Sequence, residues 1–196
     1  MARVKRVGVL ALQGDFEAHQ KALARAGAEA AEVRVAADLD EIDGLIIPGG
    51  ESTTMLRIIN EEGLMEPLRR FGGRRPIFGT CAGAILIASE VSHPAQESLG
   101  LADIGVERNA YGRQLDSRVV EIEPEEAFVR EAGPGGLEAV FIRAPIIRRL
   151  GPGAKVYLRY NGDPVLIGQG RHLIGTFHPE LTSDTRTHKL FLDRLL

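Results

Sequence analysis

The stretch FGTCAG at residues 78–83 decides the predicted fold of this chain, because it places the only cysteine of 196 residues between two glycines. Gly79 and Gly83 stand two residues before and two residues after Cys81. This spacing is typical of a nucleophile elbow, here with cysteine in place of serine. An elbow holds its nucleophile on a sharp turn from a strand into a helix, and nearly bare neighbours let that strand and helix pack. We therefore predict that Cys81 is a catalytic nucleophile.

The alternative for Cys81 is a buried structural cysteine, since a free cysteine behaves as a small apolar side chain. For a cysteine without special neighbours we would choose that alternative, but the glycines on both sides favour the elbow. A helix that begins at Ala82 would also point its N-terminal amides and positive dipole end at the sulfur, which favours the thiolate.

The segment GTFHPE at residues 175–180 supplies a candidate acid–base pair. A thiol nucleophile needs a base, and the base needs a partner that holds its tautomer and steadies its positive charge. Residues two apart in extended backbone project to the same side, so His178 and Glu180 should share one face, with Pro179 restricting the backbone between them. The alternative is a solvated turn with an incidental histidine. We choose that interpretation only for the remaining histidines, which are His19, His93, His172 and His188.

A third motif, LIIPGGEST at residues 45–53, predicts a buried strand that ends in a proline and two glycines. A helix then opens with Ser or Thr in the capping position. Such a turn exposes backbone N–H groups, and acyl transfer from a thiolate needs two N–H donors for its oxyanion. The predicted donors are the amides of Gly50 and Ala82. Phosphate binding is the competing interpretation, which we disfavour because no lysine follows and neither a dinucleotide-binding nor a Walker pattern is present.

Composition and charge restrict the class of protein. Hydrophobic residues make up 44% of the chain and charged residues 26%, as in ordinary globular proteins. A net charge of −3 argues against a nucleic-acid partner. One cysteine leaves no intramolecular disulfide, and the apolar run near the N-terminus is too short for a signal peptide or membrane span, so we expect a cytoplasmic protein. The length favours a single domain over residues 1–196.

Strands and helices alternate over much of the chain. The hydrophobic pattern predicts strands at residues 6–12, 30–34, 44–47, 76–78 and 173–177, and helices at residues 16–25, 53–62, 64–71, 82–89 and 185–195. Shorter extended stretches are predicted at residues 103–108, 119–122, 139–143, 155–160 and 165–167, after a loop at residues 93–103. We therefore expect a three-layer α/β/α sandwich with a mostly parallel central sheet, whose ligands bind at the carboxyl ends of the strands.

Taken together, the three motifs resemble those of triad-type (class I) glutamine amidotransferases. More closely, the whole chain is similar to the glutaminase subunits of pyridoxal 5′-phosphate synthases. The closer resemblance rests on LQG at residues 12–14, ERN at 107–109, GRQLDS at 112–117 and FIRAP at 141–145. It implies the class I glutamine amidotransferase fold.

The resemblance also implies residue roles. Cys81 would attack the side-chain amide of glutamine to form a thioester, His178 would act first as base and then as acid, and Glu180 would orient His178. The family's glutamine-binding positions match Gly50, Glu51, Ser52, Arg113, Ile142 and Arg143.

For both arginines in this list an alternative role remains open. A guanidinium suits the α-carboxylate of a free amino acid, which supports Arg113 against the alternative of an ordinary surface arginine. For Arg143, a packed structural arginine and a direct ligand contact are equal alternatives.

The resemblance further implies a partner, a separate (βα)₈-barrel synthase subunit in a large hetero-oligomer, which would use the released ammonia to build pyridoxal phosphate. We expect no cofactor or metal in the chain, because its histidines and single cysteine form no ligand set. Gln13 follows the first predicted strand at the edge that carries Gly50 and Cys81, and we expect it to couple partner docking to the oxyanion site. The alternative is that Gln13 caps a surface turn.

Two other functions compete with an ammonia-supplying glutaminase. The same triad could serve another amidotransferase or a partner-independent hydrolase of γ-glutamyl conjugates, which would be fully active alone. A non-catalytic or chaperone-like protein could use the same scaffold. The His178-Pro179-Glu180 sequence argues against it, and alkylation of Cys81 by a glutamine analogue would distinguish the two.

Overall fold

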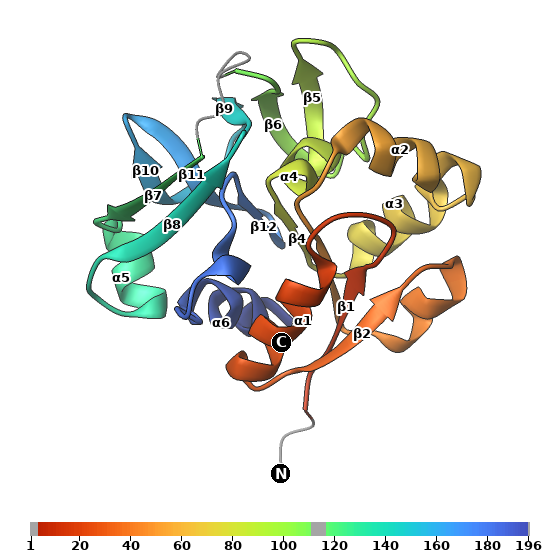
Figure 1. Ribbon diagram of the computed structural model, residues 1–196, viewed down its shortest axis with the longest axis horizontal. Helices are drawn as coiled ribbons and strands as arrows, with labels where there is room; N and C mark the ends of the chain where they lie inside the picture. Colours follow the sequence, from red (N-terminus) through yellow and green to blue (C-terminus); the bar gives the residue numbers. More distant parts are fainter. Residues whose placement is uncertain (1–3, 111–116, 196) are drawn as a thin grey trace.

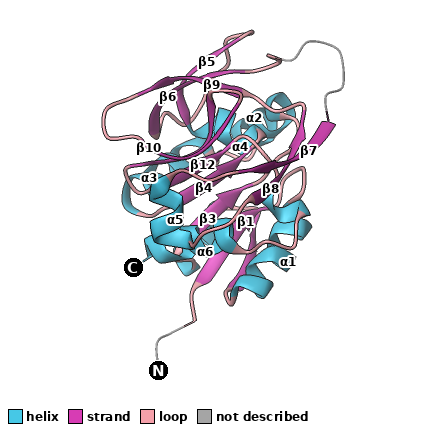
Figure 2. Cartoon of the chain, turned by 90° about the vertical axis from the view of Figure 1, so that its left-hand side faces the viewer, coloured by secondary structure: helices cyan, strands magenta, loops and turns pink. Residues whose placement is uncertain are grey.

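A seven-stranded sheet runs through the middle of the computed structural model, which describes residues 4–110 and 117–195 (Figures 1 and 2). The strand order is β10-β11-β12-β4-β3-β1-β2. Neighbouring strands from β12 to β2 are parallel, and β10 and β11 add antiparallel pairs at one edge. The predicted mostly parallel sheet is therefore confirmed. The strands are β1 (Arg6–Leu10), β2 (Glu29–Val33), β3 (Gly44–Ile47), β4 (Ile77–Thr80), β10 (Lys155–Tyr160), β11 (Asp163–Gln169) and β12 (His172–Gly175).

Helices cover both faces of this sheet, as the three-layer prediction requires. Figure 1 shows α2, α3 and α4 on one side of the central strands and α1 and α6 on the other. Each group of helices shares a buried apolar cluster with the sheet. The first group is α2 (Ser52–Glu61), α3 (Met65–Arg74) and α4 (Ala82–Ile87), and the second is α1 (Phe16–Ala26), α5 (Glu126–Ala132) and α6 (Arg186–Leu192).

Strand β3 illustrates why the central strands are apolar at every position. Leu45 and Ile47 belong to the cluster with α2–α4, whereas Ile46 belongs to the cluster with α1, α5 and α6. Successive side chains of a strand point to opposite faces of the sheet, so a strand covered on both faces needs a continuous apolar run.

Two smaller sheets stand beside the central one. One contains β5 (Ala88–Ser92), β6 (Ala102–Glu107) and β9 (Ile146–Leu150), and the other contains β7 (Ser117–Ile122) and β8 (Leu137–Ile142). The prediction that the elbow helix continues to residue 89 is wrong, because α4 ends at Ile87 and β5 begins at once. The carbonyls of Leu86 and Ile87 accept hydrogen bonds from Leu99 and Leu101 N–H, at 2.7 and 3.0 Å, instead of continuing the helix.

The carboxyl ends of β1, β3, β4 and β12 all lie at the same edge of the sheet, since these strands are parallel. The segments that follow them carry the predicted functional residues Gln13, Gly50, Cys81 and His178. This edge is where open α/β sheets bind their ligands. In the described ranges, no helix combines the length and apolar character needed to cross a membrane.

Candidate active site

Cys81 stands on the sharp turn between β4 and α4, with φ 49° and ψ −106°. This is a positive φ for a residue with a side chain, and such backbone persists where its surroundings hold it. The Cys81 N–H donates a 2.9 Å hydrogen bond to the Gly175 carbonyl of β12. A Cβ at Gly79 would come within 2.6 Å of the Gly83 carbonyl oxygen, and one at Gly83 would collide with the Ile47 carbonyl oxygen. The structure therefore has the elbow backbone that the glycine spacing predicts.

His178 and Glu180 are joined by a 2.7 Å hydrogen bond between Nδ1 and Oε1. Both residues are buried, with 3% and 4% of their surface exposed. The backbone that brings them together differs from the prediction. Strand β12 ends at Gly175, and Pro179 begins a short 3₁₀ turn, η2 (Pro179–Leu181), so the backbone between the pair is not extended. Proline suits the first position of such a turn because it lacks an N–H and its φ is fixed.

Further contacts fix the position of His178 and shift its pKa. Its N–H donates a 2.8 Å bond to the Val140 carbonyl of β8, which anchors the segment after β12. Burial disfavours a charged imidazole, but interactions with Cys81 and Glu180 outweigh burial and raise the pKa of His178 to about 10. The other ring nitrogen, Nε2, is buried without a hydrogen-bond partner among the described residues. This nitrogen could therefore exchange a proton with a thiol or a substrate.

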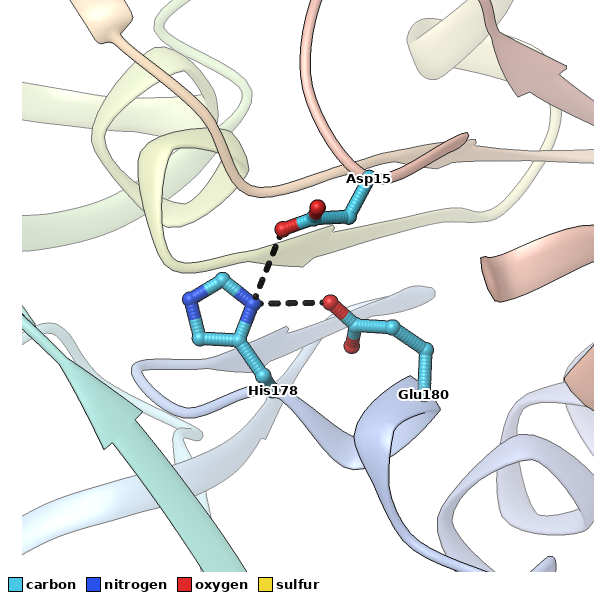
Figure 3. Close-up of side chains that lie close together, drawn as sticks. All are labelled: Asp15, His178 and Glu180. Carbon is cyan, nitrogen blue, oxygen red and sulfur yellow. Dashed lines mark hydrogen bonds and ion pairs between the residues drawn. The ribbon is translucent and has the colours of Figure 1, made fainter. Parts of the chain in front are cut away.

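A second carboxylate faces the same nitrogen. Asp15 Oδ2 lies 3.5 Å from His178 Nδ1, beside the Glu180 contact, as Figure 3 shows. Asp15 occupies the N-cap position of α1, yet its side chain makes no capping hydrogen bond. Ligand atoms of Asp15, His178 and Glu180 lie within 4.8 Å of one another, a spacing that a metal ion could use. Nδ1 already donates its hydrogen to Glu180, so we do not interpret the group as a metal site. We interpret His178 and Glu180 as a hydrogen-bonded pair, to which Asp15 adds a second carboxylate.

A cavity of about 280 Å³ opens in front of Cys81. It gathers most of the predicted site residues, although they come from widely separated parts of the sequence. Arg113 lies outside the described residues, and Glu180 stands behind His178 rather than in the cavity wall. The lining residues are Gln13, Asp15, Gly50, Glu51, Ser52, Cys81, Ala82, Ile85, Arg108, Asn109, Ile142, Arg143, Pro145 and His178.

Glu51, and not Ser or Thr as predicted, caps helix α2. Its carboxylate accepts hydrogen bonds from the N–H groups of Thr53 and Thr54 at 3.0 and 2.8 Å. Burial opposes the charge, but these bonds and one from the Thr54 hydroxyl lower the pKa of Glu51 to about 2. Ser52 is the first helical residue, and its hydroxyl donates a 3.1 Å bond to Gln96 Oε1. Glu51 and Ser52, both predicted to bind the substrate, thus line the cavity, and their side chains already form hydrogen bonds with neighbouring residues.

The candidate oxyanion segment is tied to the loop after β1. Gln13 Oε1 accepts a 2.8 Å hydrogen bond from the Glu51 N–H, and the Asp15 N–H donates a 3.2 Å bond to the Gly49 carbonyl. In a trans peptide the carbonyl and the following N–H point in opposite directions, so the Gly50 N–H points away from Asp15. Gln13 therefore bridges two loops instead of only capping its own turn.

Ile142 and Arg143 both reach the cavity at the end of β8. The Cys81 sulfur lies 3.8 Å from the Ile142 carbonyl oxygen. Arg143 is exposed and has φ 44°, so the alternative of a packed structural arginine is wrong. Its place in the cavity wall leaves the ligand-contact prediction open.

Arg108, to which no sequence pattern assigned a role, lies in the cavity wall with 12% of its side chain exposed. One guanidinium nitrogen donates a 2.9 Å bond to Thr53 Oγ1, and another binds Gln96 Oε1. Its Nε is buried and has no hydrogen-bond partner among residues 4–110 and 117–195. The ERN stretch was a signal for this arginine, but no pattern around it gave a chemical reason to choose it.

The expectation of incidental, solvated histidines is wrong for three of the four. His19, His172 and His188 are buried, and His93 alone of this group is exposed. A helix packed on a sheet buries one face, as for His19 and His188, and a central strand such as β12 is buried on both, as for His172, so a lone histidine gives no warning of burial. His19 on α1 and His188 on α6 lie directly behind the triad.

Comparison with known proteins agrees with this geometry. A model of the SNO glutamine amidotransferase family matches residues 9–196 of the chain. The chain belongs to this family. It is 59% identical to the pyridoxal 5′-phosphate synthase subunit PdxT of Solibacter usitatus, over 98% of this chain and 100% of that protein. It is 50% identical to a subunit of the same name from Thermus thermophilus, over 95% of this chain and 96% of that protein.

One solved structure supports the family assignment, and a more distant one shares the fold. The chain is similar to a crystallised glutamine amidotransferase, with a TM-score of 0.86 and 47% identity over 96% of this chain and 98% of the other. PurLQS from Thermotoga maritima shares the fold at 17% identity, with a TM-score of 0.72 over 100% of both chains. The resemblance to glutamine amidotransferases is thus confirmed.

Proposed function

We propose that the chain hydrolyses L-glutamine to L-glutamate and ammonia with Cys81, His178 and Glu180, and delivers the ammonia to a pyridoxal 5′-phosphate synthase subunit. The observation that carries this proposal is the meeting of a strained cysteine elbow with a buried His–Glu pair at one cavity. The family to which the chain belongs, and relatives named as subunits of pyridoxal 5′-phosphate synthase, support it.

The proposed reaction has two halves. The Cys81 thiolate attacks the carbon of the glutamine side-chain amide, and the oxyanion collapses to a thioester as His178 Nε2 gives its proton to the departing ammonia. Water then attacks the thioester, with His178 now accepting the water proton, and glutamate leaves as the thiolate is restored. Glu180 steadies the imidazolium through the Nδ1 hydrogen bond in both halves.

The oxyanion would be held by two backbone amides. Ala82 is the first residue of α4, so its N–H has no acceptor within the helix. Gly50 is the second candidate, at the turn after β3, where φ is 155° and a side chain would collide with Gln13. Once both amides are in place they need no reorganisation during the reaction, which is the source of their effect.

For recognition of the amino acid, we propose Arg108 in addition to the residues expected from the sequence. Arg108 lines the cavity, where its guanidinium lies 3.9 Å from the Glu51 carboxylate, and a guanidinium is suited to bind a carboxylate. Arg143, exposed in the same lining, and Arg113, outside the described residues, are the other candidate cations. Arg108→Gln should raise KM for glutamine by roughly tenfold or more, the equivalent of one charge-assisted hydrogen bond.

Both the chemistry of ammonia and the names of the relatives support a partner protein. Free ammonia is lost to solvent, so hydrolysis is useful only beside an acceptor. We propose a barrel-shaped synthase subunit in a large hetero-oligomer, in the cytoplasm, where a single unpaired cysteine stays reduced.

The test is glutamate and ammonia release from glutamine by the purified chain, alone and with its synthase. The proposal predicts slow release alone and rapid release with the synthase. Full activity without the synthase would favour a partner-independent hydrolase. Failure of a glutamine analogue to alkylate Cys81, together with absent hydrolysis in both conditions, would favour a non-catalytic protein.

A further inference from the structure

Behind the triad, two histidines and a threonine make a buried polar network that the proposed reaction does not use. His19 Nε2 lies 3.0 Å from Thr80 Oγ1 and 3.3 Å from Glu180 Oε2. His19 Nδ1 lies 3.1 Å from His188 Nε2. Both His19 and His188 are 0% exposed. The network therefore connects α1 and α6 to the residue before the nucleophile and to the carboxylate behind the base.

The carboxylate of Glu180 explains why this network is needed. Its Oε1 holds His178, but Oε2 is buried and has no well-aligned hydrogen bond within the described ranges. Burying a carboxylate oxygen without a hydrogen bond costs folding free energy, and nothing then stops the carboxylate from rotating away from His178. His19 Nε2, at 3.3 Å, is the polar atom placed to meet that oxygen.

The contacts determine which nitrogen of His19 carries the hydrogen. A carboxylate oxygen only accepts, so a bare Nε2 lone pair at 3.3 Å would be repelled, whereas an Nε2–H is attracted. Nδ1 is then the acceptor and takes its hydrogen bond from His188 Nε2–H. Burial first, and then the charges of His188 and His178, hold the pKa of His19 well below its usual value, which keeps this neutral form.

We infer that His19 is a positioning residue for the acid–base pair: its Nε2–H, shared between Thr80 and Glu180, holds the Glu180 carboxylate in line with His178. This inference rests on the proposed glutamine hydrolysis. The array then runs from Cys81 through His178 and Glu180 to His19, with His188 fixing the tautomer of His19. Without the His19 donor, the Glu180 carboxylate is held less firmly and is less able to stabilise the imidazolium.

The titratable and charged groups that face this array come from four segments. They are Asp15 before α1, Arg25 on α1, His178 and Glu180 at η2, and His188 on α6.

Two substitutions separate positioning from mere packing. The amide nitrogen of glutamine reaches about as far as Nε2 of histidine, so His19→Gln keeps a donor for Glu180. The shorter amide of His19→Asn reaches only the place of Nδ1 and loses it. His172→Asn is the matched control, since His172 is also buried but binds the Ile77 N–H at the opposite end of β4.

The first readout is the pH dependence of Cys81 alkylation by iodoacetamide, which needs no glutamine hydrolysis. Alkylation slows below a certain pH, where the thiolate is lost, and we call this part of the profile the acidic limb. His19→Asn should move the acidic limb to higher pH by about one unit, because the imidazolium that supports the thiolate is weakened. In synthase-activated turnover the same variant should lose roughly 10–100-fold in kcat with little change in KM. His19→Gln and His172→Asn should keep the wild-type limb.

Folding failure of His19→Asn does not leave the inference open, because imidazole ¹⁵N NMR of the wild-type chain near neutral pH provides a second test. His19 should be neutral with its hydrogen on Nε2, and an Nδ1–H tautomer or a charged ring would overturn the inference. An unmoved alkylation limb in folded His19→Asn would overturn it as well, and so would an equal shift in His172→Asn. Absent glutamine turnover in the wild type with a shifted limb in His19→Asn would instead overturn the proposed function alone.

Discussion

Glu180 holds His178 through a 2.7 Å hydrogen bond between Oε1 and Nδ1, and both side chains are buried behind the cavity that contains Cys81. The bond leaves Nε2 of the imidazole available for the proposed proton exchange with Cys81. In the proposed reaction the carboxylate therefore acts only through the histidine. Because His178 would carry the proton and Glu180 would only hold His178, substitutions of the two residues should have different effects.

His178→Asn should remove synthase-activated glutaminase activity almost as completely as loss of the nucleophile, because no group is left to carry the proton. Glu180→Gln keeps the imidazole but weakens its orientation, so its loss of kcat should be roughly a hundredfold smaller. The double variant should be no worse than His178→Asn, since the residues act as a unit. Independent, multiplying losses in steady-state assays would place Glu180 outside the catalytic array.

The packing of the elbow predicts opposite effects for two glycines. Gly83→Ala should lower the free energy of unfolding by roughly 1–3 kcal/mol or more, because its Cβ would collide with the Ile47 carbonyl. Gly73→Ala is the matched control, on the exposed side of α3, where the added Cβ would meet no described atom within 4 Å beyond its own stretch of helix. It should raise the free energy of unfolding by about 0.5–1 kcal/mol. Urea denaturation measures both, and a Gly83→Ala variant of native stability would contradict the tight elbow.

Buried histidines predict the response to acid. Burial, helped by nearby arginines, lowers the pKa of His172 and of His188 to about 4, below the usual 6.5. Between pH 4 and pH 6.5 these histidines are therefore protonated in the unfolded chain but not in the folded chain. Their contribution to stability is therefore complete above pH 6.5 and is lost as pH falls toward 4. The loss is on the order of 3 kcal/mol for each histidine.

His172→Asn removes one of these titrating groups. Its free energy of unfolding should fall less steeply than that of the wild type between pH 6.5 and 4, as urea midpoints at several pH values would show. Parallel curves for the two proteins would mean that His172 is protonated equally in the folded and unfolded chains.

Gln13 should link the synthase to the oxyanion site. Its Oε1 binds the Glu51 N–H, and the neighbouring Asp15 N–H holds the Gly49 carbonyl, so a partner pressing on this loop could turn the Gly49–Gly50 peptide. One oxyanion donor is worth roughly 10²–10³ in rate. Wild-type turnover should therefore rise by this order when the synthase is added, and Gln13→Ala should respond less. Equal wild-type rates with and without synthase would disprove the switch, and an unchanged response of Gln13→Ala would remove Gln13 from it.

The sequence predicted the parts of the site that depend on spacing along the chain. Glycines on both sides of Cys81 are required by an elbow that has no room for a Cβ, so the turn was predictable. The pairing of His178 with Glu180 was predictable too, but the 3₁₀ turn that produces it was not, because a proline suits extended and turning backbone alike.

The remaining features depend on tertiary contacts. Helix α5 and strand β9 were not predicted, since each is short and has only a few apolar residues to reveal its period. The role of Glu51 as the cap of α2 was hidden because Ser52 and Thr53 are themselves good caps. Arg108 and His19 reach the site from elements distant in sequence, and no local pattern marks such approaches.

Glutamine hydrolysis by Cys81→Ala, measured with the synthase present, tests the central claim most directly. Alanine keeps the Cβ of the cysteine and adds no atom to the elbow, so the variant should fold and still bind the synthase, as thermal unfolding and gel filtration can verify. The thioester mechanism predicts that glutamate release falls to the uncatalysed background in this folded, synthase-bound variant. Glutamine-dependent turnover that survives the substitution would contradict it.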